Sequence, residues 1–170
     1  LDMYVEAIKA RGMIPVLVTA MPRTGSGRYS ESDLKPNGFN PDSPGNMRAK
    51  AASDSSVGLV ELYEGAKEYI DSLDSKEVNY IYNMIEAGET PANNSANGAN
   101  SDGTHYRESA AKQWCRIMLQ SIYDQSVASE DIYTDRDIMK ELVSYMPHEV
   151  VDAAKTGDWS AVFPEMALDV

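Results

Sequence analysis

Apolar positions along this chain follow two patterns, short unbroken runs and stretches with helical spacing. The runs 13–20 and 57–62 are rich in valine, leucine and isoleucine, which is typical of strands buried on both faces in a parallel sheet. Helical composition or spacing predicts helices at 1–12, 46–52, 66–73, 78–85, 106–122, 131–146 and 150–154. Because helices and strands alternate, the chain is predicted to adopt an α/β fold with a parallel sheet.

The helical pattern at the start of the chain has no cap before it. Leu1, Val5 and Ile8 share one helical face, and Gly12 is a helix terminator. We therefore expect Leu1 to lie inside a helix of a protein that has lost an N-terminal part. Only two strands are visible, whereas sheets usually hold about four to six, so the remaining strands are expected upstream of Leu1.

Two polar stretches are predicted to be loops. The first, 24–43, is rich in glycine, serine and proline, and the second, 88–104, is rich in asparagine and contains almost no side chain that could form a core. At the other end of the chain, four apolar residues are expected to dock the tail on the body of the protein: Trp159, Phe163, Met166 and Leu168.

Length and charge narrow the classes of function. The 170 residues, of which 42% are apolar, suit one compact domain with a core. The 15 basic and 27 acidic residues give a net charge of −12, which disfavours nucleic acid and anionic membranes as partners. The single cysteine, Cys115, excludes an intrachain disulfide and a multi-cysteine metal site. No stretch approaches the roughly 18 unbroken apolar residues that span a bilayer.

The strongest catalytic candidate is His105, which follows the asparagine-rich stretch and precedes a helix. Asp102 lies three residues before it, and in a tight turn this carboxylate can accept a hydrogen bond from Nδ1–H of the imidazole. Such a pairing fixes the tautomer and leaves Nε2 free as a general base. The same spacing also arises by chance, and Asp102 or Thr104 can equally be the cap of the helix that follows.

The other candidates favour structural interpretations. His148 has no acidic residue three positions before it and is interpreted as a surface or packing histidine. Residues 93–104 resemble a calcium loop, but Thr104 stands where glutamate is needed and no carboxylate occupies the first positions, so we reject the site. Gly25-Ser26-Gly27 is interpreted as a flexible turn and Cys115 as a small core residue, and no metal or cofactor is expected.

The motif Asp102-Gly103-Thr104-His105, followed by the helix 106–122, resembles the last conserved block of the SGNH/GDSL hydrolases. In that block, Asp-x-x-His supplies two members of a Ser–His–Asp triad. The preceding order of elements, from the helix ending at Gly12 to the strand 57–62, is similar to the second half of the same fold. Within the family, the likeness is greatest to the rhamnogalacturonan acetylesterases, which are secreted enzymes that remove acetyl groups from pectin.

This resemblance implies a three-layer α/β/α fold with a flavodoxin-like parallel sheet, of which the chain is the C-terminal half. His105 would be the general base, and Asp102 would orient it. The serine, and the glycine and asparagine of the oxyanion hole, would lie upstream, so the chain alone should be nearly inert. Residues 1–125 would belong to the hydrolase domain and 126–170 to a helical extension packed on it. The implied substrate is an acetylated polysaccharide or oligosaccharide, and the implied location is extracellular.

Two alternatives remain open from the residues themselves. The first is a non-catalytic α/β interaction domain, in which Asp102 and His105 only cap a helix. The second is a flavodoxin-like nucleotide or signalling domain, which is disfavoured because neither predicted strand leads into a glycine-rich phosphate loop or ends on an acidic phosphoacceptor.

Overall fold

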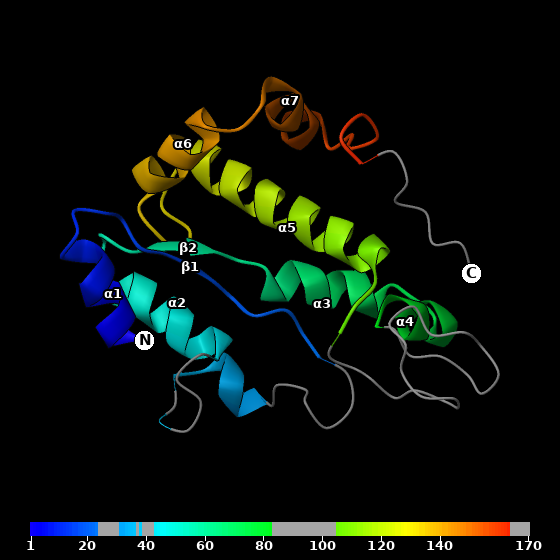
Figure 1. Cartoon of the computed structure of the whole chain (residues 1–170), viewed down its shortest axis with the longest axis horizontal. Helices are drawn as coiled ribbons and strands as arrows, with labels where there is room; N and C mark the ends of the chain where they lie inside the picture. Colours follow the sequence, from blue (N-terminus) through cyan, green and yellow to red (C-terminus); the bar gives the residue numbers. More distant parts are fainter. Residues whose placement is uncertain (24–30, 37, 39–42, 83–104, 164–170) are drawn as a thin grey trace.

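The computed structural model describes residues 1–23, 31–36, 38, 43–82 and 105–163 of the chain. Over these residues the protein is a mixed α/β structure, mostly helical, with a small parallel sheet (Figure 1). The prediction of an α/β chain with parallel strands is therefore confirmed. The predicted loop at 88–104 and most of the one at 24–43 lie outside the described residues.

The sheet consists of β1 (Val16–Val18) and β2 (Gly58–Val60), which pair in parallel with Val16 opposite Gly58. Both strands are shorter than the apolar runs that predicted them. Only three residues of each run pair in the ladder. Outside β2, Val57 and Leu62 are buried, whereas Met13 and Ile14 ahead of β1 are exposed. The run 13–20 also contains Pro15, whose nitrogen has no hydrogen to donate to a ladder.

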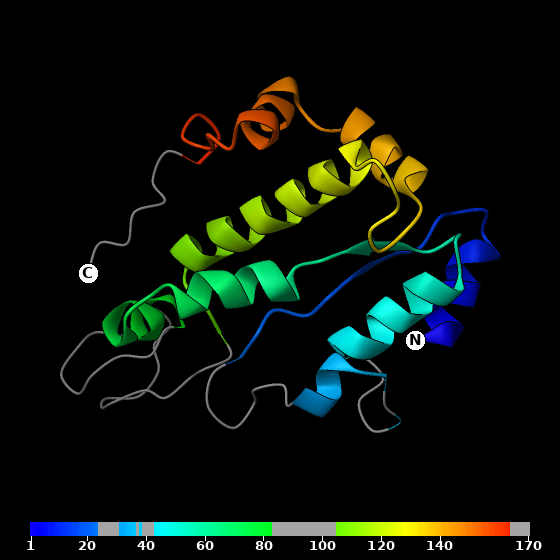
Figure 2. The same ribbon diagram turned by 180° about the vertical axis from the view of Figure 1, so that it is seen from behind.

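Helices lie on both sides of this strand pair, as both views of the ribbon show (Figures 1 and 2). On one side are α1 (Asp2–Lys9) and α2 (Pro44–Ser53). Ion pairs join these two helices, one between Lys9 and Asp54 and one between Lys50 and Asp2. A short 3₁₀ helix, η2 (Glu31–Leu34), precedes α2 and lies within the stretch that was predicted to be loop throughout.

Beyond the carboxyl end of β2 the chain forms α3 (Tyr63–Asp71) and α4 (Ser75–Ile81). Asp74 caps α4 in a capping box with Glu77, so this helix begins where the two side chains satisfy its first N–H groups. The largest core cluster gathers α3, α4 and the start of the next helix around four fully buried or nearly buried side chains: Ala66, Ile81, Tyr82 and Trp114.

The long helix α5 (Glu108–Val127) covers the other side of the strands. Two polar side chains join it to β2: Gln125 Nε2 donates to the carbonyl of Leu59 at 2.9 Å, and the Glu61 N–H donates to Ser121 Oγ at 3.1 Å. These bonds fix both the distance and the register of α5 over the sheet. The helix predicted at 106–122 is confirmed, with a further turn at its C-terminal end.

Residues after α5 form α6 (Arg136–Ser144) and α7 (His148–Thr156), both packed against α5. Thr134 Oγ1 donates to the carbonyl of Val57 at 2.7 Å, which brings α6 over the amino end of β2. Gly157 ends α7 with φ 75°, a conformation that favours glycine. Trp159 is buried against α7 and stacks with Phe163, so the described part of the tail docks as predicted, whereas Met166 and Leu168 lie outside the described residues.

Candidate functional site at the carboxyl ends of the strands

Thr19, the first residue after β1, connects the ends of the two strands. Its hydroxyl donates to Glu61 Oε1 at 2.7 Å and accepts the N–H groups of Leu62 at 2.8 Å and Tyr63 at 2.9 Å. Those two N–H groups belong to the start of α3, whose own N-cap residue Leu62 contributes no side-chain bond. The hydroxyl therefore serves as the missing cap, and it fixes the start of α3 to the end of β1.

Glu61 is a carboxylate that lies almost completely inside the protein, 6% exposed. Besides Thr19, its carboxylate accepts a hydrogen bond from Arg48 Nε on α2 at 2.8 Å, and Arg48 also reaches Glu64 at 2.9 Å. The hydrogen bond that Arg48 donates to Glu61 raises the pKa of Arg48 above its ordinary value. Because the Thr19 hydroxyl and both carboxylate oxygens of Glu61 have partners, the network is suited to holding the strand ends in place rather than to transferring protons.

The charge of the Glu61 carboxylate also affects the pKa of a neighbouring residue, Tyr133. Its pKa is raised mainly because the phenol is partly buried and secondly because of the negative charge on Glu61.

The sequence analysis did not identify Thr19, Arg48 or Glu61 as site residues. The available signal was a glutamate at the end of an apolar run, because a charge placed there needs a buried partner.

The segment that contains His105 reaches the same end of the sheet through the turn after α4. Tyr82 Oη donates to the carbonyl of Pro22 at 2.5 Å, and the Arg107 N–H donates to the carbonyl of Ile81 at 2.9 Å. Ile81 and Tyr82 are both fully buried, so this connection is rigid. Ile81 and Tyr82 thereby connect the segment after β1, at Pro22, to the segment before α5, at Arg107.

Aromatic contacts fix the residues that follow His105. The Arg107 guanidinium lies over the Tyr80 ring, 4.3 Å from its centroid, and Tyr106 meets Trp114 edge to face at 6.2 Å. Among the described polar groups, Arg107 Nε is buried without a hydrogen-bond partner. The cation–π contact is its compensation, and together these contacts anchor the backbone next to His105.

His105 itself is exposed. Asp102 lies outside the described residues, so the hydrogen bond between the two side chains stays a prediction. The N-cap residue of α5 is Arg107, which makes no side-chain capping bond, so His105 is not the N-cap of that helix. The capping interpretation of Asp102 or Thr104 concerns residues outside those that the structure describes.

Two other predicted residues have clear outcomes. His148 is a surface residue as predicted, with 87% of its side chain exposed and Nδ1 lying 3.0 Å from the Asp152 carboxylate. Cys115 is exposed, so its interpretation as a core residue is wrong. Helix neighbours point in directions about 100° apart, so burying Trp114 turns Cys115 away from the core.

The described residues contain no group of three or more histidine, cysteine or acidic side chains that could hold a metal ion. The rejected calcium loop, 93–104, and the turn 25–27 lie outside them. A helix long and apolar enough to cross a membrane is likewise missing from the part of the chain that the structure describes. Comparisons with protein-family models, curated proteins and solved structures found no match.

Proposed function

We propose that this chain is the C-terminal part of a secreted serine esterase of the SGNH/GDSL type, which removes acetyl groups from plant cell-wall polysaccharide such as rhamnogalacturonan. His105 and Asp102 are two members of its triad. The serine and the oxyanion donors come from a preceding segment, which completes a three-layer α/β/α domain with residues 1–125. Residues 126–170 form a helical extension on that domain.

One observation carries most of the support for this proposal. The segment with His105 is tied through Ile81 and Tyr82 to the chain that leaves β1, by bonds of 2.9 Å and 2.5 Å. In open parallel sheets, ligands bind outside the carboxyl ends of the strands, where loops from several strands meet. An exposed histidine in a segment tied to the chain that leaves β1 supports the assignment of His105 as the general base.

In the proposed reaction, Nε2 of His105 takes the proton from the serine hydroxyl as its oxygen attacks the acetyl carbonyl. The tetrahedral oxyanion is held by donors of the preceding segment, and this stabilisation is usually the largest catalytic contribution. The imidazolium then gives its proton to the departing sugar alcohol. Asp102 holds the imidazole in the required tautomer, and water releases acetate by the same steps in reverse order.

The test uses the complete protein with p-nitrophenyl acetate and acetylated pectin as substrates. We expect His105→Ala to lower kcat by about 10⁴-fold or more, and Asp102→Asn by about 10³–10⁴-fold, because loss of a triad member removes proton transfer as a whole. His148→Ala is the matched control, since that exposed side chain pairs only within its own helix, and it should leave kcat unchanged.

The 170 residues alone should give no turnover above buffer. Turnover by the isolated chain that disappears in His105→Ala would contradict the assignment of the nucleophile to another segment. Retention of full activity by the complete protein carrying His105→Ala would contradict the assignment of the base.

A non-catalytic interaction role is the second candidate, and exposed apolar side chains around β1, among them Met13 and Ile14, favour it. It predicts that neither substrate is turned over by the complete protein. It also predicts that substitutions at His105 leave partner binding unchanged.

A further inference from the structure

Among the residues that the structure describes, no strand lies beside one edge of β1. The Gly58 N–H donates to the Pro15 carbonyl at 2.8 Å, and the Thr19 N–H donates to the Val60 carbonyl at 3.1 Å, so residues 15 and 19 direct these groups toward β2. Because successive residues of a strand face opposite sides, the N–H and C=O groups of Val16 and Val18 point away from β2. Within the described residues the sheet has no third strand to receive them.

The side chains along this edge are apolar and exposed. Val18 is 40% exposed, Ile14 48% and Met13 52%. Charges, proline or bulges usually protect an open edge against further pairing. Here the only such residue within 13–18 is Pro15, which precedes β1 and whose carbonyl is bonded to Gly58 of β2.

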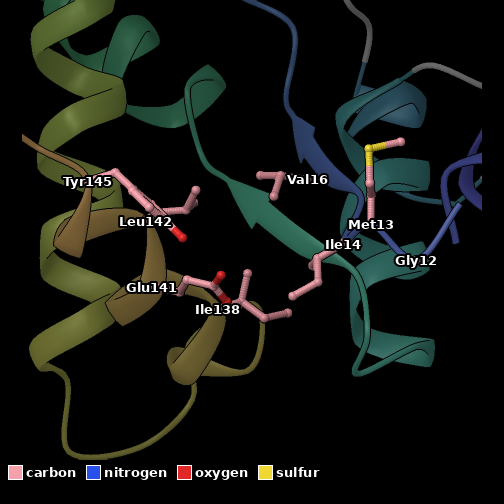
Figure 3. Close-up of a pocket in the computed structure, with 8 residues that line it drawn as sticks. All are labelled: Gly12, Met13, Ile14, Val16, Ile138, Glu141, Leu142 and Tyr145. Carbon is pink, nitrogen blue, oxygen red and sulfur yellow. The ribbon is translucent and has the colours of Figure 1, made fainter.

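An apolar pocket of about 320 Å³ adjoins the same strand. Ile14 and Val16 form one wall, and Ile138 and Leu142 of α6 form the other together with Tyr145, which follows α6 (Figure 3). Val16 belongs both to the open edge and to the pocket. If another segment paired with the open edge of β1, its side chain on the same face of the sheet as Val16 would therefore enter the pocket.

The charge in the pocket restricts what can bind there. Of the described residues that line it, Glu141 alone is charged, and its side chain reaches toward Ile138 and Ile14 in Figure 3. The whole chain carries a net charge of −12, which works against pairing with a second copy of itself. A partner with a basic side chain next to an aliphatic one matches both features.

On the interaction role named above as the second candidate, in which no preceding strand covers β1, we propose that the open edge of β1 and this pocket together bind one extended peptide segment of a partner protein. The segment adds a strand to β1 by main-chain hydrogen bonds to Val16 and Val18. It inserts an aliphatic side chain between Val16 and Leu142, and a lysine or arginine two residues away meets Glu141. Residues two apart in a strand share a face at about 7 Å, which matches the dimensions of one small pocket.

The probe is a capped, fluorescently labelled peptide, Ser-Val-Ile-Val-Lys-Val-Ser, titrated with the 170-residue chain and followed by anisotropy. We expect saturable binding. Two further peptides carry N-methyl groups on one or the other alternating set of amides. Methylation of the amides that face β1 should weaken binding about tenfold, because it removes their hydrogen bonds to β1. Methylation of the other set should not weaken binding. Equal affinity of the two methylated peptides would overturn the proposal.

A charge exchange tests the pocket separately. Glu141→Lys should weaken binding of the lysine peptide about threefold or more and improve binding of the same peptide with glutamate in place of lysine. Glu149→Lys is the matched control, because this exposed glutamate of α7 does not line the pocket. Circular dichroism of each variant checks that the chain still folds, and an identical response of the two variants would overturn the role of Glu141.

The same sample distinguishes a partner peptide from a second copy of the chain. Sedimentation should show a monomer whose mass rises only by that of the bound peptide. A dimer that the peptide dissociates would identify the second copy as the occupant and overturn the proposal of a peptide partner.

Discussion

The two strands are of equal length and pair residue for residue, yet they differ in burial. In β2, Leu59 is 0% and Val60 3% exposed, whereas Val18 of β1 is 40% exposed. The difference arises from their neighbours. β2 has β1 on one side and receives Gln125 and Thr134 from the helical layer above it. β1 has β2 on one side and no strand on the other within the described residues.

Close packing over β2 explains its glycine. A Cβ at Gly58 would lie 3.1 Å from side-chain carbons of both Ile138 and Val16, closer than most such contacts. The absence of a side chain lets α6 approach the sheet, and this approach leaves the pocket beside β1. The comparison therefore shows that, among the described residues, side chains of other segments cover β2, whereas β1 is equally apolar in composition but stays partly exposed.

The largest effect that we expect is on the free energy of unfolding, when one leucine of each strand is replaced by alanine. Leu59→Ala should lower the free energy of unfolding by about 3 kcal/mol, because it leaves a cavity in a fully buried site. Leu17→Ala should cost about 1 kcal/mol or less, since that side chain is only partly buried and its loss leaves little cavity. Urea unfolding monitored by circular dichroism measures both values, and equal losses would contradict the comparison.

A smaller effect is expected where the strand ends meet. Thr19→Val keeps the shape of the side chain but leaves the N–H groups of Leu62 and Tyr63 and the Glu61 carboxylate without their partner. Buried groups deprived of a hydrogen bond should lower the free energy of unfolding by about 2 kcal/mol. Thr19→Ser keeps the hydroxyl and should cost clearly less, by the same urea measurement. A loss with serine as large as that with valine would mean that the methyl group, not the hydroxyl, matters at this position.

Sequence patterns predicted the helices well because their spacing is local. Val5 of α1 and Ile138 of α6 are buried as helical spacing indicates, and α6 and α7 are separate helices as the predicted ranges 131–146 and 150–154 are. The prediction failed at Cys115, because this residue lies outside the buried helical stripe formed by Ala110, Trp114 and Ile117.

Features that depend on contacts between distant segments could not be predicted from the sequence. The packing of α5 and of Thr134 decides which strand is covered, and the runs 13–20 and 57–62 are both apolar, so neither indicated an exposed position. The contact between Arg48 and Glu61 joins α2 to the end of β2 and needs the fold itself to be foreseen. The motif at His105 was visible from sequence, but its pairing with Asp102 lies outside the described residues.

Native-state hydrogen exchange tests most directly whether β1 is an open edge. The Thr19 amide, bonded to Val60 at 3.1 Å, and the Gly58 amide, bonded to Pro15 at 2.8 Å, should be protected. The amides of Val16 and Val18 should exchange at least about tenfold faster, because they point away from β2. Protection of Val16 and Val18 equal to that of Thr19 in the isolated chain would contradict the account.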